Sequence, residues 1–314
     1  MNPTVVVVGS FVQDQIFVCD AFPAPGQTTL GRFITGPGGK GSNQAVAAAR
    51  AGAATRFIGA VGRDAFADAA ASFHAAEGID SRLVTKTSYP TATAGIVVNA
   101  RGENQIVVAL GASARLQPRD LPPAWLRGAR VVVAQHEASL SINRHAFRHA
   151  RRLGAITVLN PAPMRADFDP AILRLVDVLI PNENEFVALA RSLGHALRPD
   201  ALATLDAARL QTLCRALGVP VVVLTLGARG CFISLAEAGT HLPAHRVKAV
   251  DTTGAGDAFV GAFAAGLVAF DRDMLRAARF ANAAAALAVT KFGTAAAMPT
   301  ARAIARNLDF PLCR

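Results

Sequence analysis

Residues 5–10 read Val5-Val6-Val7-Val8-Gly9-Ser10. Four β-branched apolar residues in a row predict a strand buried on both faces, as in a parallel sheet, and the glycine and serine after them predict a turn. Similar apolar runs recur along the chain, separated by segments of helical length. The expected strands are 5–8, 55–58, 131–133, 156–159, 176–180 and 221–225. This alternation predicts an α/β fold with a doubly wound, mostly parallel sheet.

The composition is typical of a globular protein with a deep core. The chain has 314 residues, of which 52% are hydrophobic and only 17% charged, which argues against disorder. The alanine-rich run 281–288 contains Asn282 and is too short to cross a bilayer. The N-terminal residues lack the basic start and cleavage site of a signal peptide. We therefore expect a cytoplasmic protein with no membrane partner.

The formal net charge of +10 raises the question of nucleic acid. Lysine occurs only at positions 40, 86, 248 and 291, so nearly all the basicity is arginine. The arginines are scattered, with no basic run and no patch interleaved with aromatic residues. We interpret the charge as a solvated surface that mildly favours anionic ligands, and we expect no nucleic-acid partner.

Two regions interrupt the alternation of strands and helices. Residues 11–36 are rich in Phe, Thr, Pro and Gly, and residues 89–110 contain two strand-like runs around a polar turn. Both regions predict strands of a small separate sheet near the carboxyl ends of the core strands, where ligands bind in open α/β sheets. The expected division is an α/β core of residues 1–10, 37–88 and 111–314 with a discontinuous β-lid of residues 11–36 and 89–110.

The strongest functional signal is the stretch Asp251-Thr252-Thr253-Gly254-Ala255-Gly256-Asp257-Ala258-Phe259. We expect a strand over 246–250 before it and a helix from about 255 to 270 after it. Small residues allow a ligand to approach the backbone, and the unpaired N–H groups of a helix start suit a phosphate. The Asp257 carboxylate can take a proton from a sugar hydroxyl during phosphoryl transfer. The alternative is a glycine-rich turn in which Asp257 only complements the helix dipole.

A second glycine-rich loop reads Gly36-Pro37-Gly38-Gly39-Lys40-Gly41-Ser42-Asn43-Gln44-Ala45. It does not follow the first strand and no acid stands about 20 residues further on, which disfavours a dinucleotide site. It is not a Walker A loop either, because Gly41 follows Lys40. A polyol site fits better, since Gly39 permits close approach while Lys40 and Asn43 donate to hydroxyls. An ordinary glycine turn capped by Ser42 is the alternative.

Three further polar segments follow expected strands: 160–163, 181–185 and 225–230. Asn182 and Glu185 can hold Mg²⁺ through water, since this ion keeps several waters and takes few carboxylates. Alternatively, Asn182 and Glu183 cap the next helix, with Glu185 in its first turn. The glycine turn after Thr225 can line a nucleotide, and a plain hairpin is its alternative.

Together these stretches resemble the PfkB carbohydrate kinase family, and within it the ribokinases. The resemblance extends almost from end to end and also includes the segment Phe22-Pro23-Ala24-Pro25-Gly26. It implies a ribokinase-like three-layer sandwich, with a mostly parallel central sheet between helices and a small β-lid that often forms a homodimer clasp. It also implies ATP-dependent phosphorylation of the primary hydroxyl of a pentose, with ribose as the expected substrate and ribose 5-phosphate as the product.

The resemblance also implies roles for individual residues. The catalytic base is Asp257, and the anion hole around the phosphoryl group is formed by Gly254, Ala255 and Gly256. The sugar contacts are Asp14, Gly39, Lys40, Asn43, Glu137 and Asp257. The ATP side includes Asn182, Thr225, Gly227, Gly230 and Asn282, and Glu185 is the acid associated with Mg²⁺. An activating K⁺ lies beside the anion hole, held mostly by backbone carbonyls at Asp251, Thr253, Ala288, Lys291 and Gly293.

Two positions depart from the ribokinase pattern. Val12 stands two residues before the sugar-binding aspartate, where ribokinases have asparagine, and Ala297 stands near a serine that can ligate K⁺. A buried hydroxyl without a partner costs about 1–3 kcal/mol, so we hypothesise that the apolar Val12 favours 2-deoxyribose. Kinases of the same family for nucleosides or keto-deoxy sugar acids are further alternatives, as is a non-catalytic sugar-sensing protein on this fold.

Overall fold

The predicted alternation of strands and helices is present in the structure, a computed structural model that describes residues 4–195, 197–198, 202 and 204–308. The strands are β1 (Val5–Val8), β2 (Val12–Val18), β3 (Arg32–Gly38), β4 (Thr55–Val61), β5 (Asp80–Thr85), β6 (Thr93–Val98), β7 (Asn104–Ala109), β8 (Val131–Gln135), β9 (Ile156–Asn160), β10 (Val178–Leu179), β11 (Val221–Thr225), β12 (Cys231–Ser234) and β13 (Gly239–Leu242). The helices are α1 (Lys40–Arg50), α2 (Ala65–Ala76), α3 (Leu140–Arg152), α4 (Glu183–Ser192), α5 (Ala207–Ala216), α6 (Ala255–Ala269), α7 (Met274–Ala288) and α8 (Ala301–Leu308). The ends of the expected core, residues 1–3 and 309–314, lie outside the described residues.

The central sheet joins nine of the described strands in the order β13-β12-β11-β10-β9-β8-β1-β4-β5. Every neighbouring pair from β11 to β5 is parallel, whereas β12 runs antiparallel to both β11 and β13. The mostly parallel sheet expected from the buried apolar runs is therefore confirmed. The six strands expected from the apolar runs are all found, although the one expected over 176–180 is reduced to β10.

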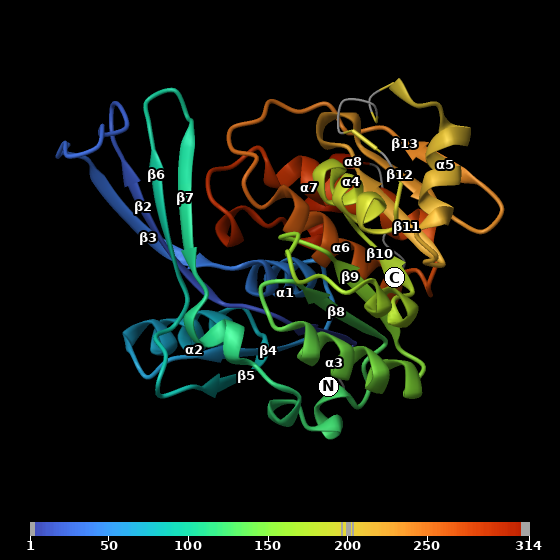
Figure 1. The fold of residues 1–314 in the computed structure, drawn as a ribbon, viewed down its shortest axis with the longest axis horizontal. Helices are drawn as coiled ribbons and strands as arrows, with labels where there is room; N and C mark the ends of the chain where they lie inside the picture. Colours follow the sequence, from blue (N-terminus) through green and yellow to red (C-terminus); the bar gives the residue numbers. More distant parts are fainter. Residues whose placement is uncertain (1–3, 196, 199–201, 203, 309–314) are drawn as a thin grey trace.

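Helices cover both faces of this sheet (Figure 1). Because side chains alternate along a strand, Val5 and Val7 point into one hydrophobic cluster and Val6 and Val8 into another. The first cluster contains residues of α1, α6 and α7, and the second contains residues of α3, α4 and α5. The run of four valines therefore lies at the centre of a three-layer arrangement.

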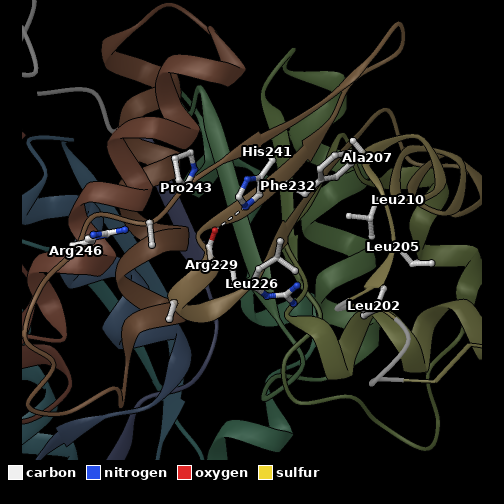
Figure 2. A pocket seen from close by; sticks show the side chains of 12 residues that line it. Leu202, Leu205, Ala207, Leu210, Leu226, Arg229, Phe232, His241, Pro243 and Arg246 are labelled. Atoms are coloured by element: carbon white, nitrogen blue, oxygen red, sulfur yellow. Dashed lines mark hydrogen bonds between the residues drawn. The ribbon is translucent and has the colours of Figure 1, made fainter.

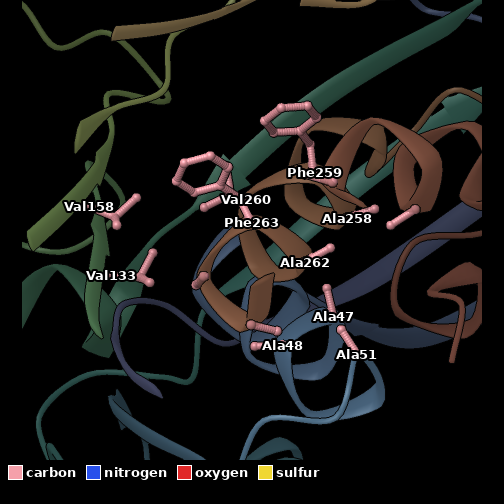
Figure 3. Close-up of a cluster of buried hydrophobic side chains, with 14 of the residues drawn as sticks. Ala47, Ala48, Ala51, Val133, Val158, Ala258, Phe259, Val260, Ala262 and Phe263 are labelled. Atoms are coloured by element: carbon pink, nitrogen blue, oxygen red, sulfur yellow. The ribbon is translucent and has the colours of Figure 1, made fainter. Parts of the chain in front are cut away.

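Helices α1 and α6 pack unusually closely. Figure 3 shows small side chains between them, among them Ala47, Ala48 and Ala262. A Cβ atom at Gly261 would lie only 2.4 Å from the backbone oxygen of Gln44. The glycine therefore lets the two helix backbones approach each other, and this brings together the two glycine-rich motifs that precede and start these helices.

The two irregular regions form one small sheet, as expected. Its order is β3-β2-β6-β7, in which β2 pairs antiparallel with β3 and parallel with β6, while β6 and β7 form a hairpin. The pairing of β2 with β6 joins the segments that are far apart in the sequence. This sheet projects from the core at the left of Figure 1, in blue and teal. Strand β3 extends to Gly38, two residues beyond the expected end of the lid segment.

The expectation of a strand over 246–250 is wrong. Strand β13 ends at Leu242, and residues 243–250 run to the start of α6 as irregular backbone. Instead of a strand, the segment meets the end of α7, where the amides of Val250 and Asp251 both donate to the carbonyl oxygen of Val289. The alternation of apolar residues over 246–250 therefore does not form a strand, although β13 just before it is an edge strand of the sheet. Among the described helices, none combines the length and apolar character needed to cross a membrane.

Candidate active site

Helices α1 and α6 both begin at glycines with left-handed backbone. Gly39 precedes α1 with φ of 88°, and Gly254 precedes α6 with φ of 79°, conformations that other residues rarely adopt. No side chain caps the start of α6, and no atom lies within 4 Å of the point where a Cβ on Gly256 would stand. The Ala255 amide donates to the carbonyl oxygen of Thr252 over 3.3 Å, and the Gly256 amide at the start of α6 remains available to an anionic ligand.

Two amides from α1 hold the carboxylate of Asp257 in α6. Asn43 Nδ2 donates to Asp257 Oδ2 over 3.0 Å, and Gln44 Nε2 donates to Asp257 Oδ1 over 2.9 Å. The side chain of Asp257 is buried, at 7% exposure. Its orientation is therefore fixed by the close contact of α1 with α6.

Buried charges surround Lys40 beside Asp257. The Asp257 carboxylate is the main cause that raises the pKa of Lys40, with Glu137 and Glu185 adding to it against the cost of burial. Burial, followed by the charges of Glu137 and Asp257, raises the pKa of Asp14 to about 7. Burial also raises the pKa of Glu137. The ammonium group of Lys40 thus lies among several carboxyl groups, in a polar site that can bind hydroxyl groups.

Glu137 connects the end of strand β8 to the glycine loop. Its Oε2 atom accepts hydrogen bonds from Ser10 Oγ and from the backbone amide of Lys40, the latter over 2.9 Å. This contact fixes the carboxylate at the first residue of α1. Glu137, a sugar contact expected from the family resemblance, therefore lies beside the glycine loop that contains Lys40.

The small sheet supplies Asp14 to the same region. Asp14 pairs with Gly36 across β2 and β3, and a Cβ on Gly38 would lie 2.2 Å from Asp14 Oδ2. A Cβ on Gly39 would lie 2.7 Å from the Val12 amide nitrogen and 3.0 Å from Val12 Cγ2. The two glycines allow the loop and the lid strand to approach closely. The residues expected to contact the sugar, Asp14, Gly39, Lys40, Asn43, Glu137 and Asp257, are thus brought together.

A cavity of about 830 Å³ opens beside the start of α6. All the residues expected on the ATP side line it, namely Asn182, Thr225, Gly227, Gly230 and Asn282. Ala255 and Gly256 also line it, so the cavity extends to the first turn of α6. It is large enough for a nucleotide and ends near the Asp257 carboxylate.

Part of the wall of this cavity is the hairpin turn between β11 and β12, so the hairpin interpretation of residues 225–230 is confirmed. Gly230 has φ of 93°, and a Cβ there would lie 2.1 Å from the carbonyl oxygen of Leu242. On the opposite wall, Asn282 Nδ2 donates to the carbonyl oxygen of Pro243 over 2.7 Å. These contacts hold the segment after β13 against the cavity, in place of the strand that we expected.

Asn182 and Glu185 form a capping box at the start of α4. Asn182 Oδ1 accepts from the Glu185 amide over 2.9 Å, while the Glu185 carboxylate accepts from the amide and the side chain of Asn182. The capping alternative considered from the sequence is therefore present. Each Glu185 oxygen accepts one hydrogen bond from Asn182 and keeps a lone pair that could accept from a water molecule bound to Mg²⁺. No group of three acidic, histidine or cysteine side chains suited to direct metal binding occurs within the described ranges.

The residues expected around K⁺ lie side by side next to Gly254. Asp251 Oδ1 accepts from the Thr253 amide and Asp251 Oδ2 from the Gly293 amide, both over 2.9 Å. The Lys291 amide donates to the carbonyl oxygen of Ala288 over 3.2 Å. The loops before α6 and after α7 are therefore tied together.

The comparison with protein families agrees with this geometry. The model described as pfkB family carbohydrate kinase matches residues 2–301. The chain belongs to this family. It is therefore a carbohydrate kinase, as its sequence motifs predicted.

Among characterised relatives, the kinase is similar to the ribokinase of Mus musculus. The two are 39% identical over 305 residues, which cover 94% of this chain and 91% of the mouse protein. It is also 33% identical over 300 residues to the deoxyribokinase of Salmonella typhi, covering 94% and 95% of the two chains.

Solved structures share the whole fold. The ribokinase from Giardia lamblia matches with a TM-score of 0.88 and 31% identity, over 98% of this chain and 99% of that chain. The Arabidopsis thaliana ribokinase complexed with ribose and ATP matches with a TM-score of 0.86 and 29% identity, over 99% of this chain and 100% of that one. The predicted three-layer α/β sandwich with its small additional sheet is thus confirmed.

Sequence reasoning missed several polar residues of this kinase. Gln44 Nε2, besides contacting Asp257, donates to Asn160 Oδ1 over 3.1 Å, and Gln135 Nε2 donates to Gln44 Oε1 over 2.6 Å. Ser10 bonds to Glu137, as described above. The available signal was a polar residue at the end of an apolar strand, which occurs after β1 and as the last residue of β8 and of β9.

A second cavity of about 510 Å³ lies beside the strands β11 to β13 (Figure 2). Leucines and Phe232 form much of its wall, and His241 Nε2 donates to the carbonyl oxygen of Arg229 over 2.8 Å. It shares Ala228, Ala244 and Arg246 with the larger cavity. None of the residues expected in the active site lines it.

Proposed function

We propose that the kinase transfers the γ-phosphate of ATP to the primary hydroxyl of ribose, giving ribose 5-phosphate. The observation that carries this proposal is the position of Asp257, which directly follows Gly256 of the nucleotide-sized cavity and whose carboxylate acts on the charge of Lys40. The similarity to ribokinases along the whole chain supports the sugar, and the similar Arabidopsis ribokinase was solved in complex with both ribose and ATP.

Asp257 is the residue we propose as general base. It takes the proton from the sugar hydroxyl as the hydroxyl oxygen attacks the γ-phosphorus. The backbone amides of Gly254, Ala255 and Gly256 stabilise the charge that develops on the phosphoryl oxygens. The sugar, bound first, contacts Asp14, Gly39, Lys40, Asn43 and Glu137, and ATP occupies the cavity between Thr225 and Asn282.

Two cations complete the proposal. Mg²⁺, when bound, neutralises charge on the phosphate oxygens, and Glu185 holds it through water. K⁺ occupies the loop pair at Asp251, Thr253, Ala288, Lys291 and Gly293, where backbone carbonyls supply most of its ligands. The K⁺ site is supported by the hydrogen bonds that join the loop before α6 to the loop after α7 beside Gly254. A cation bound there would order the anion hole.

A second candidate substrate is 2-deoxyribose, favoured by Val12. This side chain is 2% exposed and contacts the sugar loop at Gly39, so it presents an apolar surface where an amide would hold a hydroxyl. The deoxyribokinase similarity agrees with this candidate. Comparison of kcat/KM for the two sugars decides between them. A preference for ribose above about tenfold would show that Val12 does not select 2-deoxyribose.

A coupled ADP assay tests the whole proposal. Ribose, 2-deoxyribose and several nucleosides are compared, each with and without K⁺. ADP release that requires a free pentose supports the proposal, whereas release with a nucleoside assigns another substrate class. Binding of sugar without any ADP release would instead indicate a non-catalytic sensor.

We also propose that segments 11–36 and 89–110 act as a lid and form a homodimer in the cytoplasm, where ATP is abundant. The small sheet carries exposed apolar side chains, including Phe33 at 56%, Ile106 at 50% and Val107 at 76% exposure. Such a patch favours burial against a second copy. Sedimentation at micromolar concentration tests it: a dimer that Val107→Asp dissociates supports this contact, and a wild-type monomer contradicts it.

A further inference from the structure

A chain of buried side-chain amides runs behind the Asp257 carboxylate. Gln44 and Gln135 are fully buried, and Asn160 is 8% exposed. Gln135 donates to Gln44 Oε1, and the two hydrogens of Gln44 Nε2 are directed to Asn160 Oδ1 and Asp257 Oδ1. All the hydrogen-bonding capacity of the Gln44 amide nitrogen is therefore used.

The direction of this chain is set by a backbone carbonyl. Asn160 Nδ2 donates to the carbonyl oxygen of Ile180 over 2.9 Å, and the Ile180 amide is itself bonded to the carbonyl of Leu159 over 2.8 Å. A carbonyl can only accept, so Asn160 must present its oxygen to Gln44. Gln44 must then present its nitrogen to both Asn160 and Asp257. Rotation of the Gln44 amide would place its oxygen against two other oxygens.

The two oxygens of Asp257 therefore differ. Oδ1 faces the fixed donor of Gln44, whereas Oδ2 faces Asn43 Nδ2. Asn43 Oδ1 is buried and has no hydrogen-bond partner. Rotation of the Asn43 amide would bring this free acceptor to Asp257 Oδ2, where it can accept a hydrogen bond from a protonated carboxyl group. A proton on Oδ1 would face the N–H donor of Gln44, whereas a proton on Oδ2 can face the acceptor of a rotated Asn43 amide. Only Oδ2 can therefore carry a proton without two donors facing each other.

We infer that Gln44 is a positioning residue that reserves Asp257 Oδ1 and directs the proton of the substrate hydroxyl to Oδ2. This inference rests on the proposed function. In the step, the hydroxyl O–H bond breaks and its proton goes to Oδ2, while the sugar oxygen forms the bond to the γ-phosphorus. The bond from the γ-phosphorus to the bridging oxygen breaks, and its electron pair leaves with ADP. The proton later leaves Asp257 for solvent.

Other charged groups also face Asp257 and act on the same carboxylate. Lys40 at the start of α1 attracts it, whereas Asp14 on β2, Glu137 after β8 and Glu185 in α4 repel it. These residues lie at or near the expected ligands. Gln44 is buried behind the carboxylate, so its substitution tests orientation of the base without removing a proposed sugar contact.

The experiment compares Gln44→Met and Gln44→Glu with the wild-type kinase. Methionine removes the donor at similar volume, and we expect the single-turnover rate of sugar phosphorylation to fall by about tenfold to hundredfold, as for loss of a hydrogen bond to a charged group. The sugar KM should change by less than about threefold, because Gln44 lies outside the proposed sugar contacts. The acid limb of the rate–pH profile should move to higher pH, and further in Gln44→Glu, since an added carboxylate opposes ionisation.

Gln211→Met is the matched control, because Gln211 is an amide on α5 that donates to the backbone carbonyl of Leu235, after β12. It should leave the rate and the pH profile unchanged. If Gln44→Met does not fold, Gln135→Met replaces it, with a smaller slowing and a pH shift in the same direction expected. If the wild type is active but the Gln44 variant, or the Gln135 variant in its place, keeps its rate within about threefold and its acid limb unchanged, the inference is wrong while the proposed function stands. An inactive wild type overturns the proposed function instead.

Discussion

Asn43 Nδ2 and Asp257 Oδ2 lie 3.0 Å apart, although 214 residues separate them in the sequence. The contact joins the first turn of α1 to the first turn of α6, and it exists because the two helices pack backbone against backbone at Gly261. The glycine-rich motifs are thus two halves of one site. Substitutions at this junction and in the groups around it should therefore have measurable effects.

Gly261→Ala should destabilise the kinase and slow it. The added Cβ would stand 2.4 Å from the Gln44 carbonyl oxygen and 2.5 Å from Ala47 Cβ, so α1 must move away from α6. Overpacking of this kind costs about 1–3 kcal/mol of unfolding free energy. Urea unfolding measures the loss, and kcat should fall because Asn43 and Gln44 move with α1. Gly95→Ala, at a site with no atom within 4 Å of the new Cβ, is the control. A stable and fully active Gly261 variant would show that the helices tolerate separation.

Val12→Asn should shift sugar preference toward ribose. An amide at this position gives a hydroxyl the partner that valine denies it, and the difference is about 1–3 kcal/mol, or roughly fivefold to a hundredfold in the ratio of kcat/KM for ribose over 2-deoxyribose. Steady-state kinetics with both sugars measures the ratio. An unchanged ratio would mean that the distinguishing hydroxyl does not meet residue 12.

Asp14→Asn should remove a pH-dependent loss of stability. The pKa of Asp14 is raised to about 7 from the ordinary 3.8 by burial and by Glu137 and Asp257. As the pH rises, Asp14 therefore ionises in the unfolded chain before it ionises in the folded protein. The contribution of Asp14 to the unfolding free energy is fully present below pH 4 and is lost as the pH rises to about 7. Relative to wild type, the unfolding free energy of Asp14→Asn should increase from pH 4 to 7 and level off above that. Urea unfolding without sugar across this range checks it, and a flat difference contradicts the burial of this charge.

The sequence predicts most of the fold because its signals are local. The valine run of β1 and the glycine after it follow the usual pattern of a buried parallel strand and its turn. The turn at Gly254 has a positive φ, which favours glycine. The prediction of a strand over 246–250 was wrong because this segment bonds to the end of α7 at Val289, a contact between distant segments that the local pattern does not reveal. The order of β2 beside β6 likewise depends on contacts between distant segments.

The sequence motifs predicted which residues belong to the candidate site, but not the hydrogen bonds that join them. Asp257 and Asn43 stand out because a carboxylate and an amide follow glycine-rich turns, and the family resemblance extended this to Glu137. Gln44 was overlooked because an amide inside a helix has no pattern of its own. Its importance arises from Gln135 and Asn160, which the sheet places behind it. Glu185 illustrates the converse, because its sequence context fitted a helix cap and a metal ligand equally well.

The most direct test of the account is the activity of Asp257→Asn. The variant preserves the shape of the side chain and replaces the proton acceptor with an amide, so kcat should fall by about 10²- to 10⁴-fold. Isothermal titration should show that it still binds the sugar, since the other polar groups of the site remain. A variant that keeps more than about a tenth of the wild-type kcat would show that this carboxylate is not the base, and the proposed mechanism would then be wrong.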